Sequence, residues 1–228
     1  MRGERSRARV LKHAGLVAST EGLDGLTFGR LADDLGMSKA NLAALFGNKE
    51  QLQLATLDAA MECFITRAVA PALRKRSALA RLRALCDCWF DFVGSRTYPG
   101  GCFMYGTANE FAARPGPLRD RVMERFAQWR NLLASNAREA IDCGELPRDE
   151  HPGDLVCRLL ALQQGANLAI LLDDDASFAR ARTLTARHCS RFAQPRSAKP
   201  ARAFGRSRLD GPRVRGCSSA SDSKPIRS

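Results

Sequence analysis

The sequence lacks the features that mark membrane-spanning proteins and the common enzyme classes. Its longest apolar run lies near residues 166–172 and is far too short to cross a bilayer. The chain starts with charged residues rather than an apolar segment, so we expect no secretory leader and a cytoplasmic location. It contains no glycine-rich phosphate loop, no dinucleotide-binding glycine motif and no Gly-x-Ser-x-Gly elbow. We therefore expect no catalytic residues and no enzyme activity.

Metal-binding patterns are also missing, although the chain has eight Cys. None of them forms a Cys-x-x-Cys pair, and only three His are present. Cys86 and Cys88 would point about 200° apart on a helix. We therefore expect no metal site, no cofactor and reduced thiols. A redox switch through these thiols is an alternative, whereas packing of small buried side chains is the ordinary role of such residues.

Positive charge is abundant but unevenly distributed. The formal net charge is +12, and residues 193–228 carry nine Lys or Arg against two Asp, which leaves +5 for the other 192 residues. This segment is rich in Arg, Ser, Pro, Gly and Ala, and it cannot bury enough apolar surface to offset its ordering entropy. We expect residues 193–228 to form a disordered basic tail, either simply solvated or weakly attracted to DNA.

Up to residue 192, apolar residues recur with the period of helices, and no alternating strand pattern stands out. We predict an all-α fold, with a helix-turn-helix domain in residues 1–48 and a helical ligand-binding and dimerisation domain in residues 49–192. Two short helices are expected between residues 27 and 46. Asn48 is expected to cap the helix that starts at Lys49, and Pro71 is expected to end it. The longer helices are predicted over residues 4–21, 49–70, 77–95, 102–111, 118–143, 154–172 and 175–192.

The segment from residue 27 to residue 52 is the most informative part of the chain. Thr27 and Ser38 are placed to cap two short helices, and Gly36 permits the tight turn between them. This spacing is typical of a DNA-binding helix-turn-helix, whose second helix enters the major groove. The apolar positions expected to join the two helices are Phe28, Leu31, Ala32, Leu35, Leu42, Leu45 and Phe46.

A wider set of spaced residues surrounds this motif. The set consists of Gly22, Thr27, Gly36, Ser38, Leu42, Phe46, Asn48, Lys49, Glu50 and Leu52. In this order and spacing, these residues resemble the DNA-binding domain of the tetracycline-repressor (TetR) family. Residues 99–103 and 114–120 are similar to one effector-domain subgroup, so the resemblance covers about residues 5–192. It departs from the family pattern at Ala43, where Tyr or Phe is usual, and at Ala44 or Leu45, where another aromatic residue or His is common.

The resemblance implies a sequence-specific transcriptional regulator, and the second short helix supplies candidates for reading DNA. Asn41 suits direct readout, because its amide can pair with adenine N6 and N7; a solvent-facing Asn is the alternative. Lys39 can reach a phosphate or a guanine. Arg30 suits backbone anchoring but can instead pair with Asp33 or Asp34 on its own helix. The expected DNA-contacting residues are Thr27, Arg30, Ser38, Lys39, Ala40, Asn41, Ala44 and Lys49.

A basic stretch opens the first predicted helix. Five positive side chains precede the motif, with only Glu4 opposing them. Such a stretch beside a helix-turn-helix suits contact with phosphates, whereas a solvated helix start is the alternative. The five residues are Arg2, Arg5, Arg7, Arg9 and Lys12.

A symmetric homodimer is expected, because one recognition helix reads only a few base pairs and two copies read a palindromic operator. The resemblance implies that the last two helices form the dimer surface. A stripe of apolar and small residues on the first of these helices permits close helix approach, or else it is buried within the protomer. The stripe consists of Leu155, Leu159, Leu162, Gly165, Ala166 and Ala169.

The resemblance also implies a small-molecule effector of unknown identity, bound in the second domain, that shifts the DNA-reading parts. Aromatic residues at helical spacing are more often core than pocket, but a few polar groups among them would suit a ligand site. The candidate ligand-binding residues are Trp89, Phe92, Tyr105, Asn109, Gln128, Trp129, Gln163 and Asn167.

Taken together, the sequence predicts a cytoplasmic, homodimeric, ligand-responsive repressor. Its expected partners are double-stranded DNA, an effector and a second copy of the chain, with no membrane. The alternative is a helical interaction protein whose DNA-reading surface has degenerated, as the small side chains of Ala43 and Ala44 suggest.

Overall fold

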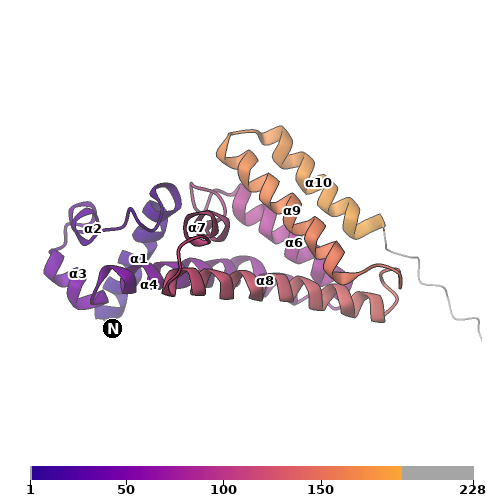
Figure 1. Cartoon of the computed structure of the whole chain (residues 1–228), viewed down its shortest axis with the longest axis horizontal. Coiled ribbons are helices and arrows are strands. Elements are labelled where there is room, and N and C mark those ends of the chain that lie inside the picture. Colours follow the sequence, from indigo (N-terminus) through magenta and orange to yellow (C-terminus); the bar gives the residue numbers. More distant parts are fainter. Residues whose placement is uncertain (1, 192–228) are drawn as a thin grey trace, which may run out of the picture. The chain divides into compact units, whose positions relative to one another are not determined.

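The computed structural model describes residues 2–191, and every regular element in this range is a helix (Figure 1), which confirms the predicted all-α class. The tail expected from residue 193 onward lies outside the described residues. Within the described range, no helix has the length and apolar character needed to cross a membrane. The elements are α1 Arg2–Glu21, α2 Phe28–Leu35, α3 Lys39–Phe46, α4 Lys49–Phe64, the π-helix η1 Ile65–Val69, α5 Ala70–Leu73, α6 Ala78–Gly94, α7 Phe103–Phe111, α8 Pro117–Asp142, α9 Pro152–Leu171 and α10 Asp175–Arg191.

Side-chain caps set the starts of α2, α3 and α4, as the sequence predicts. Thr27, Ser38 and Asn48 each accept a hydrogen bond from the backbone N–H three residues later, at 3.1, 3.1 and 2.9 Å. Each cap satisfies a donor that has no partner inside the helix and contributes about 1 kcal/mol. Gly36 then ends α2 with a φ of 63°, the left-handed conformation that a tight turn after a helix requires.

The helix that starts at Lys49 does not end at Pro71, so that expectation is wrong. Here α4 continues into η1, where the N–H of Ala70 donates to the carbonyl of Ile65, five residues back. Pro71 then falls in the first turn of α5, where its missing N–H costs little. The widened π-turn thus carries the helical path past a residue that would break a regular α-helix.

Helices α1 and α3 pack on α4, and α2 packs on α1 and α3. Leu31 of α2, Leu42 of α3 and Leu52 of α4 have no exposed surface. Burial of one such side chain contributes about 1.5–3 kcal/mol. The apolar face of α3 is therefore turned toward α2 and α4, which leaves its opposite face to solvent.

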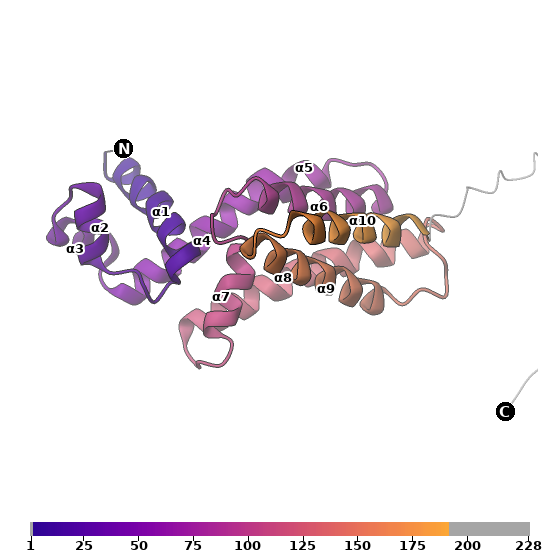
Figure 2. The ribbon, with the colours of Figure 1, turned by 90° about the horizontal axis from the view of Figure 1, so that it is seen from above.

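The remaining helices form a second layered group around α8. Figure 2 shows α9 and α10 side by side, and both also pack against α6. Trp89 and Phe90 of α6 are fully buried in the centre of this group, where their rings meet edge to face at 5.0 Å. Helix α7 packs against α8 and α4 and so joins the two groups.

The apolar stripe predicted on α9 faces the inside of the protomer. Leu155, Leu159 and Ala166 have no exposed surface, and Ala169 is 5% exposed. The expectation that these residues meet a second copy is therefore wrong, and the alternative of burial within the protomer holds for them. The helical period identified an apolar face correctly, but it did not identify what that face packs against. Only Gly165 of the stripe is exposed.

The loop between α6 and α7 lies very close to α1. A Cβ built on Gly100 would lie 1.6 Å from the carbonyl oxygen of Ser19, so only glycine fits there. A Cβ on Gly15 would lie 3.1 Å from Cε1 of Tyr98, which explains a glycine inside α1 at a helix position where Ala would otherwise be preferred. These two contacts fix the end of α1 to the second group of helices.

We predict that Gly100→Ala destabilises the protein by about 1–3 kcal/mol, because its Cβ overlaps the backbone of Ser19. Chemical denaturation measures the loss. Gly106→Ala in α7 is the matched control: a Cβ there meets nothing within 4 Å, so the change should raise stability by about 0.5–1 kcal/mol. Equal stability of Gly100→Ala and the wild type would contradict the close approach.

Candidate functional site

One face of α3 is exposed along its whole length. Lys39, Ala40, Asn41 and Ala44 are exposed, whereas Leu42 on the opposite face has no exposed surface. Residues three and four apart share a helix face, so positions 40, 41 and 44 present one continuous surface. A major groove about 12 Å wide admits a helix with such a surface.

Further predicted DNA-binding residues surround the start of α3. Ser38 and Thr27 are exposed caps, and the first N–H groups of a helix favour an anion. Lys39 lies against Gly29 at the start of α2, where its Cε would be 3.3 Å from a Cβ built on that glycine. Lys49 is exposed, and its Nζ donates to the carbonyl of Asp24 at 2.8 Å. The structure thus brings these side chains to the same part of the molecule.

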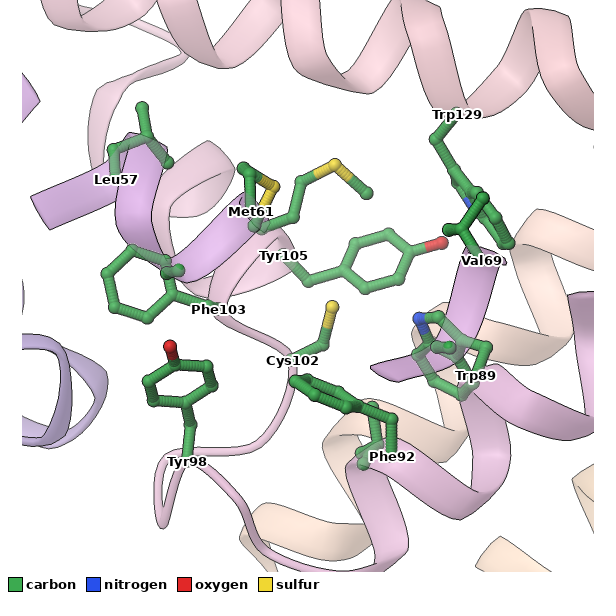
Figure 3. Close-up of a cluster of buried hydrophobic side chains, with 14 of the residues drawn as sticks. Leu57, Met61, Val69, Trp89, Phe92, Tyr98, Cys102, Phe103, Tyr105 and Trp129 are labelled. Atoms are coloured by element: carbon green, nitrogen blue, oxygen red, sulfur yellow. The ribbon is translucent and has the colours of Figure 1, made fainter. Parts of the chain in front are cut away.

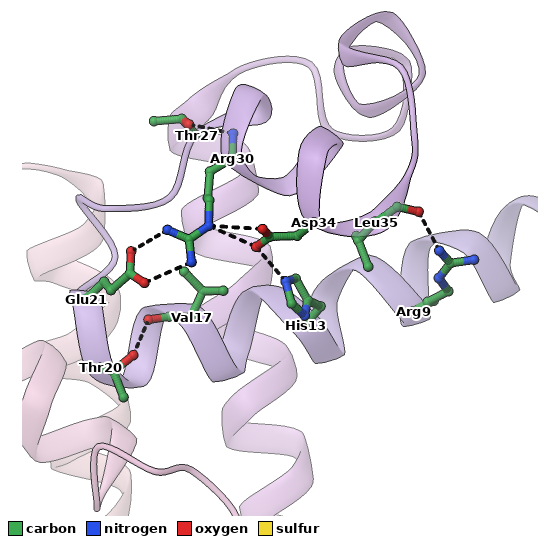
Figure 4. Close-up of polar contacts among 9 residues, drawn as sticks. All are labelled: Arg9, His13, Val17, Thr20, Glu21, Thr27, Arg30, Asp34 and Leu35. Atoms are coloured by element: carbon green, nitrogen blue, oxygen red, sulfur yellow. Dashed lines mark hydrogen bonds and ion pairs between the residues drawn. The ribbon is translucent and has the colours of Figure 1, made fainter.

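Arg30 is held within the protein, in the manner that the sequence left as an alternative (Figure 4). Its Nε donates to Asp34 at 3.0 Å, and its Nη1 and Nη2 both donate to Glu21 at 3.1 Å. Asp34 also pairs with Nε2 of His13 at 2.8 Å. The hydrogen bonds from His13 and then Arg30 lower the pKa of Asp34 below its usual range. This network ties α2 to α1 and engages the guanidinium of Arg30 with two carboxylates, while 45% of the Arg30 side chain stays exposed.

Two arginines of the basic first helix bind the ends of the motif helices. Arg7 donates to the carbonyl of Leu45 at 2.7 Å and lies over the ring of Phe46, 4.5 Å from its centroid. Arg9 donates to the carbonyl of Leu35 at 2.7 Å (Figure 4). Cations at helix C-termini satisfy free carbonyls and interact favourably with the helix dipole. These two arginines therefore hold α3 and α2 in place on α1.

A carboxylate from α7 holds the turn that precedes α2. The N–H groups of Leu23 and Asp24 donate to Glu110 at 2.9 and 2.8 Å. Gly22 starts this turn with a φ of 79°, and a Cβ on it would lie 2.9 Å from Oε1 of Glu110. The first glycine of the spaced motif is thus required both by its backbone conformation and by the close carboxylate.

A second candidate site is an apolar cavity of about 300 Å³ between α4, η1, α7 and α8. Figure 3 shows Val69 and Trp129, two of its lining residues, among the buried side chains. Of the predicted ligand-binding residues, Gln128 and Trp129 line it. The other lining residues could not be identified from the sequence, because they come together only when α4, η1, α7 and α8 pack side by side. The missed lining residues are Met61, Phe64, Ile65, Val69, Met104, Arg125 and Leu132.

Three aromatic candidates lie in the packed core and do not line this cavity. Trp89 and Phe92 border a void of only about 10 Å³. Tyr105 (Figure 3) is 4% exposed. Its hydroxyl donates to the carbonyl of Leu160 at 3.2 Å. Burial raises the pKa of Tyr105 well above its usual range. The structure therefore gives these side chains a packing role.

The polar candidates have separate roles. Gln163 is fully buried and accepts a hydrogen bond from Nε1 of Trp129 at 3.1 Å. Asn167 accepts from the N–H of Cys102 at 2.6 Å and so holds the start of α7. Asn109 is exposed and borders a different hollow, beside the end of α1. The eight predicted ligand residues are thus not brought together at one site.

An ion-pair cluster joins α4 to α8 beside the cavity. Asp58 of α4 accepts from Arg121 and, at 2.8 Å, from Nη2 of Arg125. Burial alone would raise the pKa of Asp58, but the hydrogen bonds from both arginines outweigh it, and the pKa lies below its usual range. Arg125 borders both the cavity and a larger hollow that reaches Leu45 and Phe46 at the end of α3.

Two of the cysteines, Cys86 and Cys102, pack in the core of the part of the chain that the structure describes. No group of three or more His, Cys, Asp or Glu there is arranged to hold a metal ion. Cys86 and Cys102 are buried. Contact with Cys189 and burial raise the pKa of Cys86, and burial raises the pKa of Cys102. Thiols with raised pKa values are weak nucleophiles, so packing explains these two residues.

Residues 78–185 match the family described as tetracyclin repressor-like, C-terminal domain. The capped helix-turn-helix precedes this region. Residues 78–185 therefore belong to the tetracycline-repressor family. No curated protein sequence matches the chain.

Several solved structures share the fold. A TetR transcriptional regulator from Chloroflexus aurantiacus J-10-FL has a TM-score of 0.76 and 24% identity, covering 85% of this chain and 98% of that one. A putative transcriptional regulator from Saccharomonospora viridis in complex with choline has a TM-score of 0.72 and 20% identity, over 84% and 100% of the chains. AibR in complex with isovaleryl coenzyme A and operator DNA has a TM-score of 0.61 and 21% identity, over 79% and 98%. At these identities, the likeness establishes the fold.

We predict that Asn41→Ala weakens binding to specific DNA by about 1–3 kcal/mol and leaves binding to random DNA nearly unchanged, because the lost amide reads a base. Lys39→Ala is the comparison variant: it should weaken binding to both DNAs and reduce the salt dependence, as loss of a phosphate contact does. Fluorescence anisotropy with labelled duplexes measures both. Equal losses on the two DNAs for Asn41→Ala would defeat its assignment to base readout.

Proposed function

We propose that this TetR-family regulator is a ligand-responsive repressor that binds a palindromic operator as a homodimer. The observation that supports this most directly is the outer face of α3, where exposed side chains lie opposite a fully buried anchor at Leu42. The inner face and the caps at both ends hold the helix rigidly, so the outer face is available to DNA.

In this proposal, the residues around α3 divide into two roles. Asn41 reads a base edge, and Ala40 and Ala44 offer apolar contact to a thymine methyl group. Phosphates bind at the start of α3 and fix the register of the helix in the groove. Arg30 is not among these contacts, because Glu21 and Asp34 occupy its guanidinium. The phosphate contacts are assigned to Thr27, Ser38, Lys39 and Lys49.

The proposed dimer surface is the outer face of α9 and α10. Leu168 lies in the last turn of α9, and Leu172 follows the end of this helix; they are 56% and 68% exposed. Leu171 is 50% exposed, and Leu184 on the neighbouring α10 is 39% exposed. Leu168, Leu171 and Leu172 are three and four positions apart and so share one face, and exposed apolar groups on one face mark an interaction surface. A second copy suits this face because a two-fold axis would also pair two copies of α3 on DNA.

The proposed effector site is the apolar cavity beside α4. Its volume of about 300 Å³ lies at the lower end of the range for small-molecule sites. Two relatives with the same fold were solved with bound small molecules, one with choline and one with isovaleryl coenzyme A together with operator DNA. The cavity lies between the DNA-reading helices and the proposed dimer helices along the chain, where a ligand can bias their relative placement.

We predict that Leu168→Glu converts a dimer into a monomer, because the charge would be buried at the proposed interface. The wild type should enrich inverted repeats from a pool of random duplexes, whereas the variant should enrich a single half-site with weaker binding. Analytical ultracentrifugation and sequencing of the selected DNA measure the two effects.

The control is Met123→Glu, which places the same charge at a 49% exposed apolar residue of α8. It should leave the dimer and the selected DNA unchanged. A wild type that enriches single half-sites would overturn the palindromic operator. A wild type that enriches no sequence would support the alternative of a helical interaction protein with a degenerate DNA-reading surface.

A further inference from the structure

The surface of the effector cavity is almost entirely apolar, and its two polar lining residues are Arg125 and Gln128. Among the other lining residues, Phe64 and Trp129 meet edge to face at 5.4 Å. Arg125 borders the cavity on one side and the larger hollow at the end of α3 on the other, with 26% of its side chain exposed. Gln128 lies beside it and accepts a hydrogen bond from its Nη1 at 3.1 Å. The cavity therefore fits a molecule with an apolar body and one polar end.

The hydrogen-bonding capacity of Arg125 is not fully used. Its Nη2 donates to Asp58 at 2.8 Å, and its Nη1 donates to Gln128. Its buried Nε has no hydrogen-bond partner among the residues that the structure describes. A guanidinium carries five N–H donors, and a buried donor without an acceptor costs free energy. A carboxylate suits this position best, because it can accept two parallel hydrogen bonds from one arginine.

The charged residues around Arg125 are paired in a way that leaves room for one further carboxylate. Arg121 also pairs with Asp58, so this carboxylate keeps a partner if Arg125 turns away. Glu124 is engaged elsewhere: it lies 3.3 Å from Nε of Arg121 and accepts from Nε2 of Gln128 at 3.1 Å. Arg125 would repel a cationic ligand. A neutral ligand would not draw Arg125 away from Asp58.

We propose that the effector is an apolar molecule with one carboxylate group, and that this carboxylate competes with Asp58 for Arg125. The inference rests on the proposed function, since it assigns a chemical class to the effector of the same cavity. Binding transfers Arg125 from α4 to the ligand and removes one of the two ion pairs that hold α4 to α8. Because α3 packs on α4, the ligand thereby changes the restraint on the DNA-reading helix.

Isothermal titration calorimetry with three eight-carbon probes tests the class. Octanoate, octanol and octylamine share an apolar chain and differ in the head group, and octanoate should bind at least about tenfold more tightly than the other two. Fluorescence of Trp129, which lines the cavity, should change on binding. Ile65→Trp, which fills the cavity from a 39% exposed wall position, should abolish binding of octanoate.

Three variants test the competition. Arg125→Gln should weaken octanoate binding at least about tenfold and change octanol binding by less than about twofold. Asp58→Asn should strengthen octanoate binding several-fold, because a neutral amide competes less for Arg125. Arg121→Gln is the matched control: it removes the other ion pair of Asp58 but does not line the cavity, so octanoate affinity should stay within about threefold. Circular dichroism confirms that each variant is folded.

The proposal is supported if octanoate affinity falls in Arg125→Gln and rises in Asp58→Asn. If Arg125 and Asp58 had only a structural role, both variants would bind octanoate more weakly. Equal affinity for octanoate and octanol, or a loss in both variants, overturns it. Octanoate that fails to bind the wild type also overturns it. Selection of an inverted repeat from random DNA does not depend on these titrations, so the proposed regulator stands even if octanoate fails to bind. If octanoate binds but no DNA sequence is selected, the proposed regulator is contradicted and the ligand class is not.

Discussion

One helix, α4, belongs to both halves of the described structure, and the rest of the account depends on how it is held. Its start packs beneath α1 and α3, and Asn48 caps it directly after the DNA-reading helix. Its end supplies Met61 and Phe64 to the cavity wall. Between these points, Asp58 ties it to α8. Because a helix is stiff along its axis, a change at one end displaces the other.

A second connection limits how the DNA-reading helices can move. Glu110 of α7 accepts from two backbone N–H groups in the turn before α2, and the loop at Gly100 is pressed against the end of α1. The α1–α2 turn is therefore fixed to α7 while α4 is fixed to α8. A change that loosens only the contact between α4 and α8 would let α3 pivot about the contact between the α1–α2 turn and α7. Ligand control requires a two-state element of this kind.

Much of the fold and part of the site could be predicted from the sequence, because capping and helical period are local properties. Thr27, Ser38 and Asn48 cap the helices as expected, and the outer face of α3 is exposed as the motif requires. The rest depends on tertiary contacts that a local pattern does not contain. The stripe at Leu155 shows an apolar face but not its partner, the π-helix before Pro71 has no clear signal, and Arg125 becomes a ligand candidate only when α8 packs beside α4.

The most direct test of the central claim is linkage between the cavity and DNA. Affinity for the selected operator should be measured by anisotropy at increasing octanoate concentrations, and octanoate affinity should be measured with and without saturating operator. Loosening of α4 adds freedom that DNA binding must remove, so octanoate should weaken operator binding, and operator should weaken octanoate binding by the same factor. Operator affinity that stays constant while octanoate saturates the Trp129 signal would contradict the account.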